Sequence, residues 1–399
     1  MVEPSLRDLR AIAVPAYGPS ILSAVGSGAI VPVVALSARD LGASVGTAAF
    51  MVALLGIGRL LGDLPAGAAA ERFGERRSLM VASGIEFVGG AGCLFARQVW
   101  LLAVSILLIG VAGALFALAR QAYLIDAVPI ELRARALSTL GGVARIGLFF
   151  GPFVGALFIG IWGTGAAYVV DMIASVGAFL LVLLTRDITA HRRRAETADR
   201  NRAGVLAIVV QYRRVLATVG VAVLFISVAR SCRTALVPLW AETLGLDSAH
   251  TSLVFGISGA VDMLLFYPSG AAMDRYGRTI IALPSMIILA LGMVLLPLSG
   301  SFGTLTIVSV ILGFGNGIGA GLVMTMGADA SPVTSRTKFL AGWRLMSDTG
   351  TALGPTLIGI ITIAFPLAVA ALAMGALSLL GAGWAGFWVP RYDPTRSRD

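Results

Sequence analysis

Long apolar stretches separated by short polar breaks dominate the chain from end to end. Each is close to the roughly twenty residues that a helix needs to cross a hydrocarbon core of ~30 Å. The pattern predicts twelve membrane-spanning helices and an all-α membrane protein. Their expected ranges are 13–37, 45–70, 79–97, 99–128, 136–161, 164–185, 215–240, 249–273, 279–299, 302–330, 338–364 and 366–389.

The composition agrees with a membrane bundle and excludes an ordinary soluble domain. Hydrophobic residues make up 57% of the chain and charged residues only 13%, whereas soluble domains carry about 25% charged residues. Glycine is abundant, at 49 residues, as expected where helices pack closely through small side chains.

The net charge of +9 reflects membrane topology rather than nucleic-acid binding. If the N-terminus is cytoplasmic, 22 of the 30 basic residues fall in the tails and loops on that side, whereas Arg39 and Arg97 face the other side. Such a bias follows the positive-inside rule and allows contact with anionic membrane lipid. We expect a multi-pass protein of the inner (cytoplasmic) membrane with both termini in the cytoplasm.

The chain contains an internal repeat at a constant offset of 203 residues. The offset superimposes Pro65–Gly74 on Pro268–Gly277, and Gly151-Pro152 on Gly354-Pro355. Repeats of this length fix the architecture. We expect two six-helix lobes, residues 1–185 and 215–399, joined by a basic cytoplasmic linker of residues 186–214.

One repeated element is a short loop that we interpret as a cytoplasmic gate. Gly67 and Gly270 are expected to end helices, and Gly74 and Gly277 to turn the chain with positive φ. Acids between them can pair with basic groups across the loop or at a neighbouring helix end; alternatively the arginines are only topological anchors. The candidate gate residues are Gly67, Glu71, Arg72, Gly74, Arg76, Asp126, Gly270, Asp274, Arg275, Gly277 and Asp329.

A second repeated element removes side chains from one face of the fifth and eleventh helices. It reads Gly147-x-x-x-Gly151-Pro152-x-x-Gly155 in the first lobe and Gly350-x-x-x-Gly354-Pro355 in the second. Small residues permit close helix approach, and proline frees a backbone carbonyl. We expect packing and hinge elements here, centred on Gly151, Pro152, Gly354 and Pro355.

Together these elements resemble the major facilitator superfamily over essentially the whole chain. The stretch Gly67–Arg77 is similar to the signature loop of that family, with Glu71 where aspartate is usual, and Gly147–Gly155 is similar to a motif of its drug:proton antiporters. The resemblance implies the major-facilitator fold, alternating access and a monomer. The chain departs from the antiporter pattern at Ile106, where arginine is usual, and it has no acid between Ala11 and Ala38.

Several ionisable residues lie near the middle of predicted helices, where each is costly and needs a partner or a function. The offset of 203 relates Arg59 to Asp262 and Arg145 to Asp348, so equivalent positions carry opposite charge. With the helix arrangement that the resemblance implies, two pairs would join the lobes, Arg59 with Asp348 and Arg145 with Asp262, and protonation of an aspartate would loosen one. One competing interpretation pairs Arg59 with Asp63 and Arg344 with Asp348 within single helices, and another leaves these groups unpaired and facing a cavity.

Further polar and aromatic residues are candidates for lining a central cavity. Glu86, like Asp171, is either a proton acceptor or a neutral acid satisfied by a neighbouring helix. Arg230 either attracts anions or extends its head group to the interface. The candidates are Glu86, Arg120, Tyr123, Arg230 and Asn316.

These features predict a secondary transporter that couples proton movement to export of amphipathic compounds or metabolites. The alternative is a proton symporter or uniporter that imports a small polar or anionic metabolite, and a remote alternative is a non-transporting receptor or scaffold. We find no nucleophile–base constellation, metal-ligand cluster or nucleotide loop, so no enzymatic activity, metal or cofactor is expected. The partners would be a small-molecule substrate, protons and lipid, with no nucleic acid.

Overall fold

The computed structural model describes residues 6–128, 133–185, 210–332 and 336–393, and within these ranges the regular structure is entirely helical. The first half contains α1 (Leu6–Ile30), α2 (Val34–Asp40), α3 (Val45–Phe73), α4 (Glu75–Leu94), α5 (Val99–Ala127), α6 (Arg133–Trp162) and α7 (Ala166–Leu184). The first predicted span is broken: α1 and α2 meet at a bend of 41°. Pro32 lies in this break. Proline lacks the amide hydrogen that would continue the helix, which explains why the helix is interrupted here.

The second half follows the predicted spans with two irregularities. It contains α9 (Arg213–Val215), a π-helical segment (Leu216–Gly220), α10 (Val221–Thr243), α11 (Ser248–Tyr276), α12 (Thr279–Leu295), α13 (Phe302–Ile318), α14 (Leu322–Ala330), α15 (Arg336–Ala364) and α16 (Leu367–Trp388), with short 3₁₀ turns after α12 and α16. The tenth predicted span is divided between α13 and α14 at Gly319–Gly321. Glycine there lowers the helical preference of the backbone.

Most of the predicted spans are recognisable from length and apolarity alone. Among the described residues, nine helices meet both criteria, and a tenth span is counted if the bent α1–α2 pair is one. The two other predicted spans, α4 and α15, are long enough but carry more charge. The N-terminus of α4 holds Glu75, Arg76 and Arg77, and α15 holds Arg344 and Asp348 in addition to two basic residues in its first turn.

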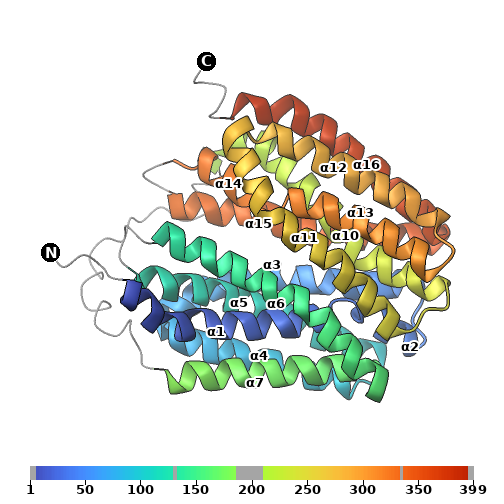
Figure 1. The fold of residues 1–399 in the computed structure, drawn as a ribbon, viewed down its shortest axis with the longest axis horizontal. Helices are drawn as coiled ribbons and strands as arrows, with labels where there is room; N and C mark the ends of the chain where they lie inside the picture. Colours follow the sequence, from blue (N-terminus) through green and yellow to red (C-terminus); the bar gives the residue numbers. More distant parts are fainter. Residues whose placement is uncertain (1–5, 129–132, 186–209, 333–335, 394–399) are drawn as a thin grey trace. The chain divides into compact units, whose positions relative to one another are not determined.

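The chain divides into two compact units, which we describe separately. The N-terminal unit comprises Met1–Val33 and Ile57–Asn201, and the C-terminal unit comprises Val34–Gly56 and Arg202–Asp399. In the N-terminal unit α1 packs against α6 and α7, and α4 packs against α5 and α7 (Figure 1). In the C-terminal unit α10 packs against α15 and α16, and α11 against α13 (Figure 1). The predicted division at residues 186–214 stays a prediction, because residues 186–209 of that linker lie outside the described residues.

The glycine faces of the fifth and eleventh predicted helices lie at close helix contacts inside each unit. A Cβ placed at Gly151 of α6 would lie 2.5 Å from the carbonyl oxygen of Val25 and 2.7 Å from Cα of Gly28, both on α1. A Cβ placed at Gly350 of α15 would lie 2.5 Å from the carbonyl oxygen of Leu224 on α10. Only glycine fits these positions without separating the helices.

The predicted gate loops turn where expected, but their helices end later than expected. Gly74 and Gly277 have φ of 90° and 91°, which confirms the predicted positive-φ turns. Gly67 and Gly270, by contrast, lie inside α3 and α11, which continue to Phe73 and Tyr276. The prediction that these two glycines end helices was wrong, because the alanines that follow them favour helix continuation more than one glycine opposes it.

Candidate functional site

A polar network crosses three helices of the C-terminal unit at the level of the predicted intramembrane charges. Arg230 of α10 donates from Nε to Oδ1 of Asn316 on α13 at 2.7 Å. Asn316 in turn donates from Nδ2 to Oδ2 of Asp262 on α11 at 2.6 Å. The amide of Asn316, which is only 7% exposed, therefore bridges a basic and an acidic group. Satisfied networks of this kind orient their members in a low-dielectric interior.

A second arginine of α10 extends the polar region on the same face. Arg233 donates to Oγ of Ser258 on α11 at 2.9 Å, and its guanidinium lies 5.7 Å from the ring centre of Phe255. Ser258 donates in turn to the carbonyl oxygen of Ser309 on α13 at 2.5 Å. Arg233 is thus held between a hydroxyl group and an aromatic face, an arrangement that suits the planar guanidinium.

The acid of the eleventh predicted span contacts a basic residue of its own helix. Nε of Arg344 lies 3.4 Å from Oδ2 of Asp348, one turn along α15. Ser347, the residue before Asp348, contacts α10, where its hydroxyl group lies 3.0 Å from that of Ser227. The intrahelical pairing considered for Arg344 and Asp348 is therefore present, whereas the pairs proposed between Arg59 and Asp348 and between Arg145 and Asp262 join different units and stay predictions.

In the N-terminal unit, the predicted charged residues are distributed over separate helices. Arg59 of α3 lies beside Gly113 of α5, with Nε 3.7 Å from where a Cβ would stand, and attracts Glu86 of α4 electrostatically. The side chain of Arg145 on α6 is partly buried. Asp63 lies one turn after Arg59 on α3, with both carboxylate oxygens shielded from solvent.

The two remaining cavity candidates of this unit lie on α5. Tyr123 is 4% exposed and belongs to the apolar core around Leu115, Phe116 and Leu124. Arg120 is partly buried one turn earlier on the same helix. Their assignment to a transport cavity stays a prediction.

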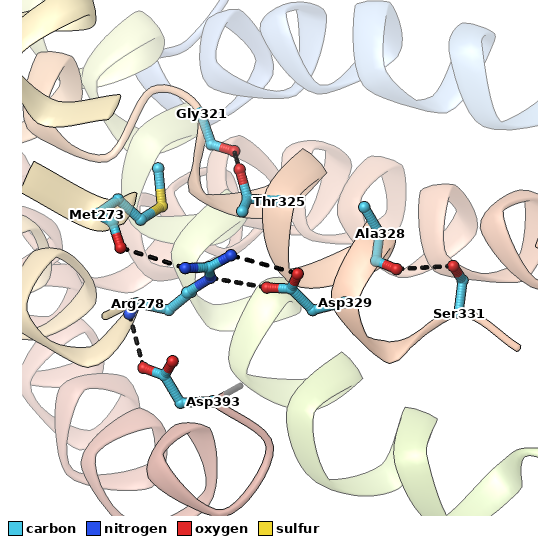
Figure 2. Close-up of polar contacts among 8 residues, drawn as sticks. All are labelled: Met273, Arg278, Gly321, Thr325, Ala328, Asp329, Ser331 and Asp393. Atoms are coloured by element: carbon cyan, nitrogen blue, oxygen red, sulfur yellow. Dashed lines mark hydrogen bonds and ion pairs between the residues drawn. The ribbon is translucent and has the colours of Figure 1, made fainter. Parts of the chain in front are cut away.

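The second copy of the gate motif forms a clamp that the sequence located only in part. Figure 2 shows the guanidinium of Arg278 gripping Asp329 at the end of α14, with Nε–Oδ2 and Nη2–Oδ1 distances of 2.7 and 3.3 Å. The backbone amide of Arg278 donates to Asp393 at 2.7 Å, and its Nη1 donates to the carbonyl oxygen of Met273 at 3.2 Å (Figure 2). Both carboxylates thus converge on one residue that follows the Gly277 turn.

Two residues that the sequence predicted for this gate, Asp274 and Arg275, do not contact Asp329. Asp274 is exposed, and the guanidinium of Arg275 lies 5.1 Å from the ring centre of Tyr276. Arg278, rather than Arg275, is the partner of Asp329. Sequence reasoning missed Arg278 because the repeat places Glu75 at the equivalent position, so the offset offered no basic residue there.

The first copy of the motif is described only in part. Arg76 donates to the carbonyl oxygens of Val182 and Leu183 at the end of α7, at 3.1 and 2.8 Å. A basic side chain is favourable at such unpaired helix C-terminal carbonyls. The side chains of Glu71 and Asp126 lie outside the part of the structure that is described, so the pairing of acids with basic groups in this loop stays a prediction.

Comparison with known proteins agrees with this architecture. The model of the Major Facilitator Superfamily matches residues 20–231 and 219–399. A D-xylose transporter of Levilactobacillus brevis is 30% identical over 34% of this chain and 29% of its own length. Multidrug resistance protein 1 of Bacillus subtilis (strain 168) is 26% identical over 41% of the chain and 42% of its own. The chain thus spans less than half the length of either relative.

Longer matches come from one further relative and from solved structures. An uncharacterized MFS-type transporter of Bacillus subtilis (strain 168) is 22% identical over 80% of this chain and 78% of its own. The crystal structure of a D-xylose–proton symporter superposes with a TM-score of 0.74 at 16% identity, covering 96% of this chain and 98% of that one. At that identity the likeness concerns the fold alone. Because the family model matches both halves, the chain belongs to the major facilitator superfamily and is a multi-pass membrane protein with the fold of its secondary transporters.

Proposed function

We propose that this transporter couples proton entry to the export of amphipathic organic compounds or metabolites by alternating access. The observation that carries the proposal is the close contact of α1 with α6 at Gly151, within the motif that resembles drug:proton antiporters. The partial match to a multidrug resistance protein supports the same assignment. Because a backbone contact without side chains can slide or tilt with little steric cost, the Gly151-Pro152 segment suits a moving joint.

In this proposal the intramembrane charges link the proton to the motion of the two lobes. Arg59 would pair with Asp348, and Arg145 with Asp262, in one state of the cycle. Protonation of an aspartate would remove one attraction and favour the other state. The ion pair between Arg344 and Asp348, at 3.4 Å, supplies a second partner that could receive Asp348 when it leaves Arg59.

We place the transporter in the inner membrane as a monomer, with both termini in the cytoplasm. The support is the excess of basic residues in alternate loops, since such loops stay on the cytoplasmic side. A cysteine introduced at exposed Phe95 or at exposed Arg77, on opposite ends of α4, tests this orientation. A membrane-impermeant maleimide added to intact cells should label the first position and spare the second.

The function itself is tested in liposomes that contain a pH-sensitive dye. A proton gradient is imposed, and lipophilic cations, neutral amphipaths and small organic anions are added in turn. Substrate-dependent proton flux that Asp348→Asn abolishes supports coupling through α15. Flux that persists in Asp348→Asn assigns coupling to another acid, whereas substrate movement without any proton flux contradicts the proposal.

One observation favours a second candidate, the import of a small polar or anionic metabolite. The network of Arg230, Asn316 and Asp262, whose two charged side chains are partly exposed, presents donors and acceptors to which a hydroxylated or carboxylated solute can bind. The partial matches to a D-xylose transporter and to a hexuronate transporter point in the same direction. Uptake of labelled sugars and sugar acids into cells, set beside extrusion of a fluorescent amphipath, discriminates the two: uptake without extrusion supports import, and its loss with a proton ionophore distinguishes a symporter from a uniporter.

A further inference from the structure

Two acids of the N-terminal unit are buried away from the charge pairs of the proposed cycle. Glu86 of α4 is 2% exposed and Asp171 of α7 is 0% exposed. Among the described residues, neither carboxylate oxygen of Asp171 has a hydrogen-bond partner, nor does Oε2 of Glu86. An ionised carboxylate that lacks both water and donors is strongly disfavoured. Most buried acids are paired, so this pair requires an explanation.

The helices pack tightly around the two acids, and the neighbours of Asp171 on α1 and α4 are glycines, which offer no side-chain oxygen ligand. A Cβ placed at Gly26 of α1 would overlap Oδ1 of Asp171, and a Cβ placed at Gly90 of α4 would lie 3.4 Å from Oδ2. Glu86 stands one helical turn before Gly90, and the two carboxyl groups repel each other electrostatically. A proton fits between two such groups without a coordination shell, whereas a metal cation needs several oxygen ligands.

Other titratable groups on the surrounding helices are few and mostly remote. Arg59 of α3 attracts Glu86, and the thiol of Cys93 on α4 interacts with Asp171. From the elements packed against the pair, α1 presents Gly26, and α5 presents Ser105 and Ile109 to the glycines that follow Glu86. The remaining titratable side chains with a described environment on α4, α7 and the helices that pack directly against them are Tyr17, Glu75, Arg76, Arg77, Arg120, Tyr123, Arg145 and Tyr168.

We propose that Glu86 and Asp171 share one exchangeable proton and form a proton-binding site of this transporter. The inference deepens the proposed function, since it rests on coupling of transport to protons. Binding transfers a proton from hydronium to one carboxylate oxygen and releases water. The new O–H group can donate to the opposite carboxylate, and the charge of the pair falls from −2 to −1, which Arg59 partly compensates.

A hollow next to the pair shows how close the acids lie to the exterior of the unit. It has a volume of about 160 Å³ between α4 and α7 and is lined by Ser83, Gly84, Phe87, Ser175, Val176 and Phe179. Ser83 precedes Glu86 by three residues and Ser175 follows Asp171 by four, so the cavity lies one turn from both acids. The surface of this hollow is apolar, since the hydroxyl of Ser175 donates to the carbonyl oxygen of Asp171 at 2.7 Å and that of Ser83 is buried, so the hollow brings the exterior within one helical turn of the acids without holding water against them.

Contacts of α1 connect the protonation state of the two acids to the Gly151-Pro152 segment of α6. Gly26 of α1 touches Asp171, and Gly28, two residues later, packs against Leu148 and Gly151 of α6. A second negative charge on the pair would push α4 away from α7, against which Gly26 of α1 packs, and so alter the contact of α1 with α6 beside Pro152. The glycines of α1 thus connect the acid pair to the proposed joint.

The test measures the proton directly and does not depend on a substrate. Purified full-length protein in lipid nanodiscs is titrated while infrared difference spectra record the carboxylic-acid carbonyl band, with wild type compared to Glu86→Gln, Asp171→Asn and the matched exposed-acid control Asp40→Asn. We expect one titrating buried carboxyl in wild type and in the control, and its loss in both other variants. A wild-type spectrum without that band, or a band that both variants retain, would overturn the proposal.

Transport assays then separate failure of this site from failure of the proposed function. In liposomes Asp171→Asn should lose proton-driven accumulation yet retain substrate exchange without a gradient, which also shows that the variant folds. If the band titrates but wild type moves no protons with substrate, the site stands and the proposed function fails. If coupled transport persists undiminished in both variants, or follows sodium rather than protons, the function is independent of the pair and the inference is wrong.

Discussion

Arg39 and Glu242 are 203 residues apart, the offset that relates the two sequence repeats, and their side chains form an ion pair. Nε of Arg39 lies 2.7 Å from one carboxylate oxygen and 2.9 Å from the other, and its Nη1 donates to the carbonyl oxygen of Ala43. Both residues belong to the C-terminal unit, at the ends of α2 and α10. Equivalent positions of the two repeats therefore meet each other with opposite charge.

We expect Arg39→Ala and Glu242→Ala each to lower the thermal midpoint slightly, and the exchange of the two residues to restore it. The two side chains are each 31% exposed, so the pair should contribute about 0.2–1 kcal/mol. A double-mutant cycle on the unfolding of the purified protein measures the coupling.

Arg97→Ala is the matched control for this cycle, because Arg97 is an exposed arginine of the first repeat. It should leave the midpoint unchanged. Additive effects of the two single substitutions, with no recovery in the exchanged variant, would contradict a direct pairing.

The sequence predicted the helices but not this contact. Apolar length defines a membrane-spanning segment almost alone, so most predicted bounds fall within a few residues of the helices. The offset of 203 residues that makes Arg59 and Asp262 equivalent positions also makes Arg39 and Glu242 equivalent. An equivalent position is not a neighbour, however, and the sequence places Arg39 in a loop on the less basic side with no sign that it meets its counterpart.

Features that depend on tertiary neighbours could not be predicted in this way. Periodicity does not show that Arg278 rather than Arg275 reaches Asp329, since both follow the same turn and only the position of α14 decides between them. Nor does it show that Asp171 faces Gly26, a contact made by two helices far apart in the chain. The break at Pro32, by contrast, had a local signal in the missing amide donor.

We predict that Gly151→Ala destabilises the protein and impairs transport, whereas Gly160→Ala on the same helix does neither. The added methyl at Gly151 would lie 2.5 Å from a backbone oxygen of α1, while nothing lies within 4 Å at Gly160. Overpacking costs about 1–3 kcal/mol, and exchange of glycine for alanine in a helix recovers up to about 1 kcal/mol. Thermal unfolding of both variants tests this, and equal midpoints would argue against a tight α1–α6 contact.

Asn316→Ala should destabilise the C-terminal unit, because it removes the amide that bridges Arg230 and Asp262. Loss of a buried hydrogen-bonding partner costs about 1–3 kcal/mol. The control is Ser309→Ala on the same helix α13, whose hydroxyl oxygen is buried without a hydrogen-bond partner in the described structure; its removal should be nearly neutral. If Ser309→Ala proves as harmful as Asn316→Ala, general packing rather than the network explains the effect.

Arg278→Lys should weaken the contacts to Asp329 and Met273 in Figure 2, although the substitution keeps the positive charge. A lysine cannot contact Asp329 through two nitrogens while also reaching the carbonyl oxygen of Met273. We expect a lower thermal midpoint and faster proteolysis at the end of α14. Arg275→Lys, whose guanidinium instead lies over Tyr276, is the control and should differ little from wild type; a reversed order would assign the clamp to Arg275.

Asp247 caps the N-terminus of α11, and this cap should be lost in acid. Oδ1 of Asp247 accepts from the backbone amide of His250 at 2.8 Å, and this hydrogen bond lowers the pKa of the carboxyl group from its usual value near 3.8. Because the folded-state pKa is lowered, the stabilisation is fully present above the ordinary aspartate pKa and disappears as the pH falls through the lowered one. The side chain is 65% exposed, so solvent keeps the pH-dependent part of the stabilisation small, whereas loss of the cap itself costs about 1 kcal/mol.

Asp247→Ala should therefore lower the thermal midpoint at neutral pH, and Asp247→Ser, which can cap without titrating, should largely preserve it. The difference between wild type and Asp247→Ser, followed from about pH 6 to about pH 3, reports the titration of Asp247 together with its contact to the His250 ring at 2.8 Å. A wild-type advantage should shrink towards the acid end, and an advantage that grows there would show that the carboxylate is not the form that stabilises α11.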